Sequence, residues 1–170
     1  MKKIGFFVIF CFLVGCGKTS DVAQLQEYRQ KLLAVQAESV QTLQDYYSSL
    51  EEGQSGMQIL AVYHATLADL QQLSDQLQEI EVQDKDFHIA VGNYLSGLQA
   101  AFLRYEAPVI TALGVLSGER SLSYQEEHQR IVASTMQFGS ELAQLDKTFD
   151  HAYQAFYHRY KDQFSPALTP

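Results

Sequence analysis

Cysteine, proline and basic residues are scarce in this chain, and each scarcity excludes a class of protein. Both cysteines, at positions 11 and 16, lie near the amino terminus, so the rest of the chain has no thiol for a disulfide or a haem attachment. Prolines occur only at positions 108, 166 and 170. Twenty acidic residues against twelve basic ones give a formal net charge of −8, which disfavours binding to nucleic acid or to anionic lipid head groups.

The sequence also lacks the short motifs that are typical of enzymes. It contains no G-x-S-x-G or S-x-x-K nucleophile motif and no glycine-rich phosphate-binding loop. A di-iron bundle would need Glu-x-x-His. The residues three positions before the five histidines are Ala61, Lys85, Gln125, Thr148 and Ala155, none of which is a carboxylate. We therefore expect neither an enzyme nor a bound cofactor.

The first apolar stretch is too short to cross a membrane as a mature helix. It runs from Ile4 to Val14, eleven residues that include Gly5, whereas a transmembrane helix needs ~18 or more. Lys2 and Lys3 precede it. A positive segment followed by ~7–15 apolar residues is typical of a secretory signal peptide.

The end of this stretch, Leu13-Val14-Gly15-Cys16, resembles the lipobox of bacterial lipoproteins. The resemblance covers residues 1 to 20 and implies that the Cys16 thiol is lipidated, that residues 1–15 are removed and that the new amino terminus is acylated. Two or three acyl chains hold a protein stably at a membrane. Gly17 stands where an aspartate would imply retention in the inner membrane, so the resemblance implies the periplasmic face of the outer membrane. The alternative is a plain secretory signal with an accidental cysteine.

The chain beyond Cys16 is long enough for one domain with a real core. Removal of Lys2 and Lys3 with the signal peptide changes the formal net charge to −10. We assign residues 16–20 to a lipid-anchored linker, 21–165 to the folded domain and 166–170 to a short tail.

The periodicity of the domain is helical throughout, and no stretch alternates with the period of two of a β-strand. Four helix starts carry capping residues: Asp21 with Gln24, Ser55 with Gln58, Asp84 or Asp86, and Ser123 with Glu126. Gly53 marks the end of the first predicted helix, and Gly118 marks the end of the third. The first apolar stripe comprises Val22, Leu25, Leu32, Leu33, Val40, Leu43, Tyr47 and Leu50. The fourth alternates in steps of four and three along Phe138, Leu142, Leu145, Phe149, Ala152 and Phe156.

Four amphipathic helices joined by short turns predict an all-α, antiparallel up-down-up-down four-helix bundle with long helices of roughly 25 to 42 residues. The third stripe comprises Phe87, Val91, Tyr94, Leu98, Phe102, Tyr105, Val109, Ala112 and Leu116. Pro108 falls inside it and predicts a kink there. The apolar stripes contain no charged residue, whereas a ligand site inside a bundle needs converging polar groups.

The aromatic end of the fourth helix is the candidate partner-binding site. Its residues are Tyr153, Tyr157, Tyr160 and Phe164. Core packing explains such a set, because aromatic side chains bury large areas. A partly exposed groove for a partner helix or for lipid explains it as well, since this face is wider than the packing stripe requires.

Two histidines and an acidic run are the remaining candidates for chemistry. In an antiparallel bundle His88 lies level with about residue 150, near His151, and a zinc or copper ion could bind there. His151 points away from the packing stripe, so solvated side chains are the alternative, and we expect no metal. The acidic run around Asp84 and Asp86 suits a helix amino terminus or a basic partner.

These observations leave two classes of function. The first is a lipid-anchored, non-enzymatic interaction or assembly module for another protein of the bacterial envelope. The second is a small-ligand or metal carrier that uses the bundle interior. The apolar stripes favour the first.

Overall fold

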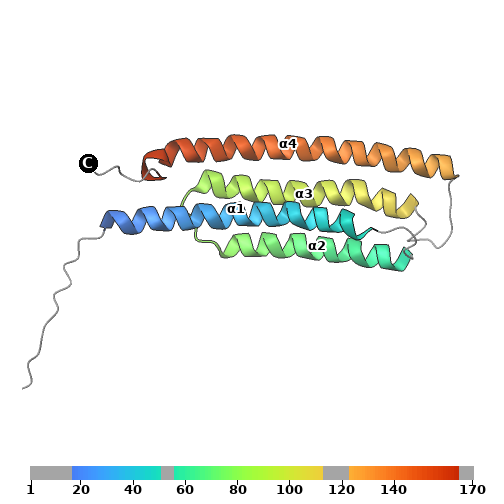
Figure 1. Cartoon of the computed structure of the whole chain (residues 1–170), viewed down its shortest axis with the longest axis horizontal. Helices are drawn as coiled ribbons and strands as arrows, with labels where there is room; N and C mark the ends of the chain where they lie inside the picture. Colours follow the sequence, from blue (N-terminus) through green and yellow to red (C-terminus); the bar gives the residue numbers. More distant parts are fainter. Residues whose placement is uncertain (1–16, 51–55, 113–122, 165–170) are drawn as a thin grey trace, which may run out of the picture.

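The computed structural model describes residues 17–50, 56–112 and 123–164, and every regular element within them is an α-helix (Figure 1). The helices are α1 (Gly17–Ser49), α2 (Gly56–Glu79), α3 (Lys85–Ala112) and α4 (Tyr124–Phe164), with 33, 24, 28 and 41 residues. They run alternately in opposite directions along one long axis (Figure 1). The predicted up-down four-helix bundle is confirmed.

The amino-terminal boundary differs from the predicted one. Helix α1 begins at Gly17, so residues 17–20, assigned to a linker, are helical, and Asp21 does not cap the helix. No proline interrupts this stretch, and the helix extends by one turn beyond the apolar stripe. The predicted boundaries Gly53, Ser55 and Gly118 lie outside the described residues, as does Cys16.

Two predicted helix caps are present. The Ser123 backbone N–H and hydroxyl donate to Glu126 Oε2 at 2.9 and 2.7 Å, and the Glu126 N–H donates weakly to Ser123 Oγ at 3.4 Å. This is the capping box that the sequence indicates for α4. At the start of α3, Asp84 Oδ1 accepts the Phe87 N–H at 2.9 Å, so Asp84, not Asp86, is the capping residue.

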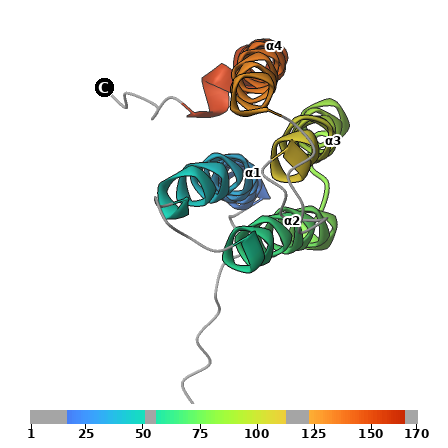
Figure 2. The ribbon, with the colours of Figure 1, turned by 90° about the vertical axis from the view of Figure 1, so that its right-hand side faces the viewer.

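The four helices do not contact one another equally. Helix α4 packs mainly against α3, and α1 packs mainly against α2, while α1 and α4 meet at only a few positions. Among the described residues α2 and α4 do not touch. Viewed along the bundle in Figure 2, α3 stands between α4 and α2, and α1 lies to one side. One flank of α4 is therefore left without a neighbouring helix along much of its length.

The core follows the predicted stripes with shifts at the ends of α1 and α3. At the end of α1, Tyr46 is the buried tyrosine, at 2% exposed, and Tyr47 is 40% exposed. Steps of three and of four from Leu43 both stay near one helical face, and in the structure the step of three, to Tyr46, is the one that points into the core.

In α3 the buried residues are Glu106 and Ile110. They come one position after the predicted Tyr105 and Val109, which are partly buried. Fully buried side chains include Leu32, Leu70, Val91, Leu98, Ala101, Phe102, Ile110 and Phe156.

Helix α3 continues through Pro108 to Ala112. Proline has no N–H, so the Arg104 carbonyl loses its intrahelical donor. One residue further along, the Tyr105 carbonyl accepts a hydrogen bond of 2.6 Å from the Ser134 hydroxyl of α4. Helix α4 thus supplies a donor to the backbone of α3 beside the proline.

Candidate functional site

The predicted partner-binding residues do not share one environment. Tyr153, Tyr160 and Phe164 are partly buried and pack against the core, whereas Tyr157 is 37% exposed. The Tyr157 ring stacks on Phe164 with centroids 5.9 Å apart. Three of the four residues therefore contribute to the packing of the fold, and only Tyr157 presents much of its ring to solvent.

A cation from α1 covers part of this aromatic end. The Arg29 guanidinium lies 5.9 Å from the Tyr153 ring centroid and 5.1 Å from that of Phe164. Its Nε atom is buried without a hydrogen-bond partner among the described residues. A guanidinium at these distances is attracted by the ring faces, so Arg29 joins α1 to α4 through cation–π contacts.

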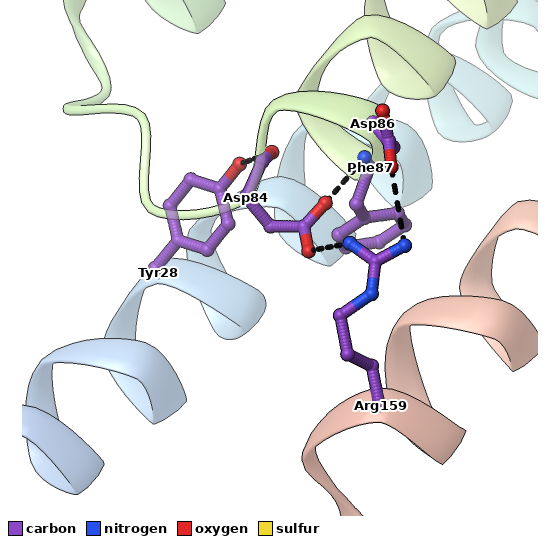
Figure 3. Close-up of polar contacts among 5 residues, drawn as sticks. All are labelled: Tyr28, Asp84, Asp86, Phe87 and Arg159. Carbon is purple, nitrogen blue, oxygen red and sulfur yellow. Dashed lines mark hydrogen bonds and ion pairs between the residues drawn. The ribbon is translucent and has the colours of Figure 1, made fainter.

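Asp84 is the centre of a polar cluster at the same end of the bundle (Figure 3). Besides capping α3, its carboxylate pairs through Oδ2 with Arg159 of α4, and its backbone carbonyl accepts the Tyr28 hydroxyl of α1 at 2.8 Å. The second guanidinium nitrogen of Arg159 donates to Asp86 Oδ2 at 3.1 Å. The expected helix cap is confirmed at Asp84, and Arg159 of the same chain pairs with both aspartates. Binding of a basic partner by this acidic run stays a prediction.

The two candidate histidines lie in different surroundings. His88 stacks on Tyr28 with centroids 6.2 Å apart, and it lines a groove of about 470 Å³ between α2 and α3. Its Nδ1 is buried without a partner among the described residues, and burial lowers the pKa of its imidazole. His151 is exposed on α4. Within the described part of the chain, no three His, Cys, Asp or Glu side chains converge in a way that could hold a metal ion.

A buried carboxylate that the sequence analysis missed lies near the other end of the bundle. Glu106 is 3% exposed, although we expected no charged residue in the apolar stripes. Its Oε2 accepts the Tyr46 hydroxyl at 2.9 Å and its Oε1 accepts the Tyr47 hydroxyl at 2.7 Å. The expectation of a purely apolar interior is wrong at this position. The signal was present, since Glu106 lies four residues after Phe102 and four before Ile110 on one helical face.

Burial and neighbouring carboxylates raise the pKa values of several tyrosine hydroxyls. Burial first, and the Glu106 carboxylate second, raise the pKa values of Tyr46 and Tyr47 far above the ordinary value. Burial raises the pKa of Tyr28 to about 12, and it does the same for Tyr94, whose hydroxyl donates to Asp146 Oδ1 at 2.9 Å. These phenols act as neutral hydrogen-bond donors.

The other large groove lies between α3 and α4 beside Pro108 and has a volume of about 890 Å³. Arg104 and Arg130 line it, and Arg104 donates to both Glu141 oxygens at 3.0 and 3.1 Å. The charges of Arg104 and Glu141 are therefore paired with each other, and the Ser134 hydroxyl in this groove is bonded to the Tyr105 carbonyl.

A second stripe runs along α4 beside the seam that packs on α3, and α3 reaches it at two positions, through Tyr94 to Asp146 and through Phe87 to Tyr153. The positions of this stripe alternate in steps of four and three, as in a helix-packing seam. We call it the α4 outer stripe; it comprises Val132, Met136, Gly139, Ala143, Asp146, Asp150, Tyr153, Tyr157, Tyr160 and Phe164. The predicted partner-binding residues are its carboxyl-terminal end. Its amino-terminal part is exposed, with Val132 at 44% and Met136 at 72%.

The fold and these clusters define a helical bundle with buried carboxylates at Asp84 and Glu106 and a flank of α4 that no other described helix covers along much of its length. Comparisons with protein families, with curated proteins and with solved structures found no match to this chain. No described helix combines the length and the apolar character needed to span a bilayer.

Proposed function

We propose that this chain is a lipid-anchored protein of the bacterial envelope that binds another envelope protein through its helical bundle. The lipobox-like segment ending at Cys16 supports the anchor, and the absence of enzyme motifs in the sequence supports a non-enzymatic role. We propose the outer membrane as the location because Gly17, and not an aspartate, comes directly after Cys16.

One observation carries the interaction role: the α4 outer stripe is exposed where it is most apolar. Val132 and Met136 lie one turn apart, and Gly139 comes next with no atom within 4 Å of where its Cβ would lie. An a/d-type spacing of apolar and small residues is the pattern that receives the side chains of a partner helix. The fold does not need these residues for its own core.

Capture from the envelope tests this proposal. The tagged full chain is purified from solubilised envelopes, and the recovered proteins are identified by mass spectrometry. We expect the Val132→Ser, Met136→Ser double variant to lose a partner that the wild type recovers, with an unchanged melting curve. Leu103→Ser is the matched control, since Leu103 is an exposed apolar residue of α3, 49% exposed and outside the stripe. Equal recovery by wild type and double variant would contradict the assignment of the surface.

The anchor has its own test. We expect Cys16→Ser to leave an uncleaved precursor without lipid label, because the thiol is the acceptor that the lipobox resemblance implies. Normal processing and membrane retention of this variant would contradict the anchored form of the proposal.

The carrier alternative depends on the bundle interior. The observation that most favours a carrier is the burial of Glu106, which places a carboxylate inside the bundle. Both oxygens of this carboxylate, however, already accept tyrosine hydroxyls. The metal version is tested by the metal content of purified protein. Stoichiometric metal that disappears in a His88→Ala, His151→Ala double variant would support it.

A further inference from the structure

We infer that the partner of the α4 outer stripe is an amphipathic helix whose apolar face carries basic residues near its middle. This inference rests on the proposed function, because it names the chemistry of the partner that the same surface takes.

The stripe has an apolar end, an acidic middle and an aromatic end. Val132 and Met136 form the first, Asp146 and Asp150 the second, and the tyrosines with Phe164 the third. Both aspartates are exposed, and neither forms an ion pair with a lysine or arginine among the described residues. Asp146 Oδ1 accepts the Tyr94 hydroxyl of α3, a neutral donor that leaves the charge of the carboxylate without a cation. A helix laid along the stripe would place two of its own seam positions against these carboxylates.

The geometry at Gly139 allows such a helix to approach closely. Nothing lies within 4 Å of the position of a Cβ there, and Ala143, the next residue of the stripe, is also small and exposed. Small residues at a seam let two helix backbones come near each other. The helix α1 does not occupy this place, because α1 and α4 meet at only a few positions and Figure 2 shows them apart.

The chain itself shows which charge the stripe accepts. At the aromatic end, Arg29 of α1 places its guanidinium over Tyr153 and Phe164, at 5.9 and 5.1 Å from the ring centroids. A basic side chain from a neighbouring helix is therefore already bound to this stripe where α1 reaches it. The aspartates, closer to the middle of α4, favour the same charge more strongly, since they carry formal negative charges.

A second copy of the chain fits the stripe poorly. Antiparallel pairing about the middle of the stripe would place Asp146 opposite Asp150, and parallel pairing would place each aspartate opposite its own copy. Like charges at facing seam positions destabilise the pair. An anionic lipid surface meets the same repulsion.

A charge-swap experiment tests the inference. The full-length lipidated protein in detergent is titrated into a labelled amphipathic peptide of about 25 residues, with leucine at its seam positions and lysine at the two central ones. A matched peptide carries glutamate at those two positions. We expect the lysine peptide to bind about tenfold more tightly than the glutamate peptide, because attraction at two facing positions is replaced by repulsion.

Variants of the protein then locate the effect. We expect Asp150→Lys to weaken binding of the lysine peptide about tenfold and to improve binding of the glutamate peptide. Asp162→Lys is the control, since Asp162 is exposed on α4 outside the stripe. Circular dichroism checks that both variants remain folded.

Several outcomes would overturn the inference. Equal binding of the two peptides, no binding of either, or the same loss with Asp162→Lys would each do so. A dimer of the protein that Met136→Asp dissociates would assign the stripe to self-association instead. The capture experiment with the Val132→Ser, Met136→Ser variant decides the proposed function separately, so an interaction module with a partner of other chemistry remains distinguishable.

Discussion

Asp84 and Glu106 are both buried carboxylates, and the fold stabilises them in different ways. Asp84 has a cation, Arg159, and the amino terminus of α3 beside it. Glu106 has two phenol hydroxyls and no cation among the described residues. Burying a charge is costly unless it is paired or well hydrogen-bonded, so both residues depend on neighbours from other helices.

The Asp84 cluster predicts a contrast between two neighbouring aspartates. We expect Asp84→Ala to lower the free energy of unfolding by about 2 kcal/mol, because it removes a helix cap together with a buried hydrogen-bond acceptor. Asp86→Ala removes only an exposed contact with Arg159 and should cost much less. Urea unfolding monitored by circular dichroism measures both. Equal losses would contradict the assignment of Asp84 as the cap.

The Glu106 cluster predicts coupling between α1 and α3. Tyr46→Phe leaves a buried carboxylate with one donor fewer, and a hydrogen bond to a charged group contributes about 1.5–3 kcal/mol. In a Glu106→Gln background the same change should cost less, since the charge is gone. A double-mutant cycle measures the difference, and a coupling energy near zero would show that the Tyr46 hydroxyl does not stabilise Glu106.

At the scale of elements, helix α4 has two faces with different roles. One face packs on α3 through Phe138, Phe149 and Phe156. The other carries the α4 outer stripe, which α1 covers only near Arg29. Val132 and Met136 flank Ser134, whose hydroxyl donates to the Tyr105 carbonyl of α3, so they stay exposed although α3 runs beside them.

Glycine inside a helix lets a neighbouring helix approach closely, so the sequence predicts such contacts at Gly92, Gly97 and Gly139 of α3 and α4. The structure gives these three glycines different surroundings. At Gly97 a Cβ would lie 2.6 Å from Leu145 Cδ2, and at Gly92 it would lie 3.6 Å from Leu77 Cδ2. Gly139 has open space instead, so the expectation is wrong for this residue within the bundle.

These differences predict opposite outcomes for the same substitution. We expect Gly139→Ala to raise the free energy of unfolding by about 1 kcal/mol, because alanine is the better helix former and nothing obstructs its Cβ. Gly97→Ala must displace the Leu145 side chain and should gain less or lose stability. Thermal unfolding of the two variants compares them. A larger gain at Gly97 than at Gly139 would contradict this difference in packing.

At the scale of the whole molecule, the buried tyrosines link stability to alkaline pH. The pKa values of Tyr28 and Tyr94 are raised from 10.0 to about 12 in the folded protein, so folding favours the neutral phenols. This contribution to stability is fully present below pH 10 and is lost as the pH rises from 10 through 12. We expect cooperative unfolding in this range, with the buried tyrosines ionising as the helices melt.

Absorbance of tyrosinate, recorded together with circular dichroism, measures this linkage, and the chain has no tryptophan to interfere. Tyr94→Phe should reduce the dependence of stability on pH between 10 and 12, because one shifted group is removed. Ionisation of every tyrosine near pH 10 without loss of helix would contradict the shifted values.

The helical pattern predicts most of the architecture, and its errors have physical causes. The capping box at Ser123 and the cap at Asp84 are readable because they satisfy local backbone N–H groups. Tyr46 and Tyr47 are interchanged because both lie near the edge of the apolar stripe, where steps of three and four are equally helical. The burial of Glu106 is missed because a charged side chain inside an apolar stripe needs hydrogen-bond donors, and here both donors come from another helix.

The sequence by itself determined the four helices, their alternating direction and the lipobox-like start, because these depend on spacing and on local chemistry. Only the tertiary structure decided which carboxylates are buried, that Arg159 and Arg29 bind within the chain, and which part of the α4 outer stripe stays open. These features depend on which side chains of different helices meet in the folded bundle. The spacing of residues along one helix does not record that.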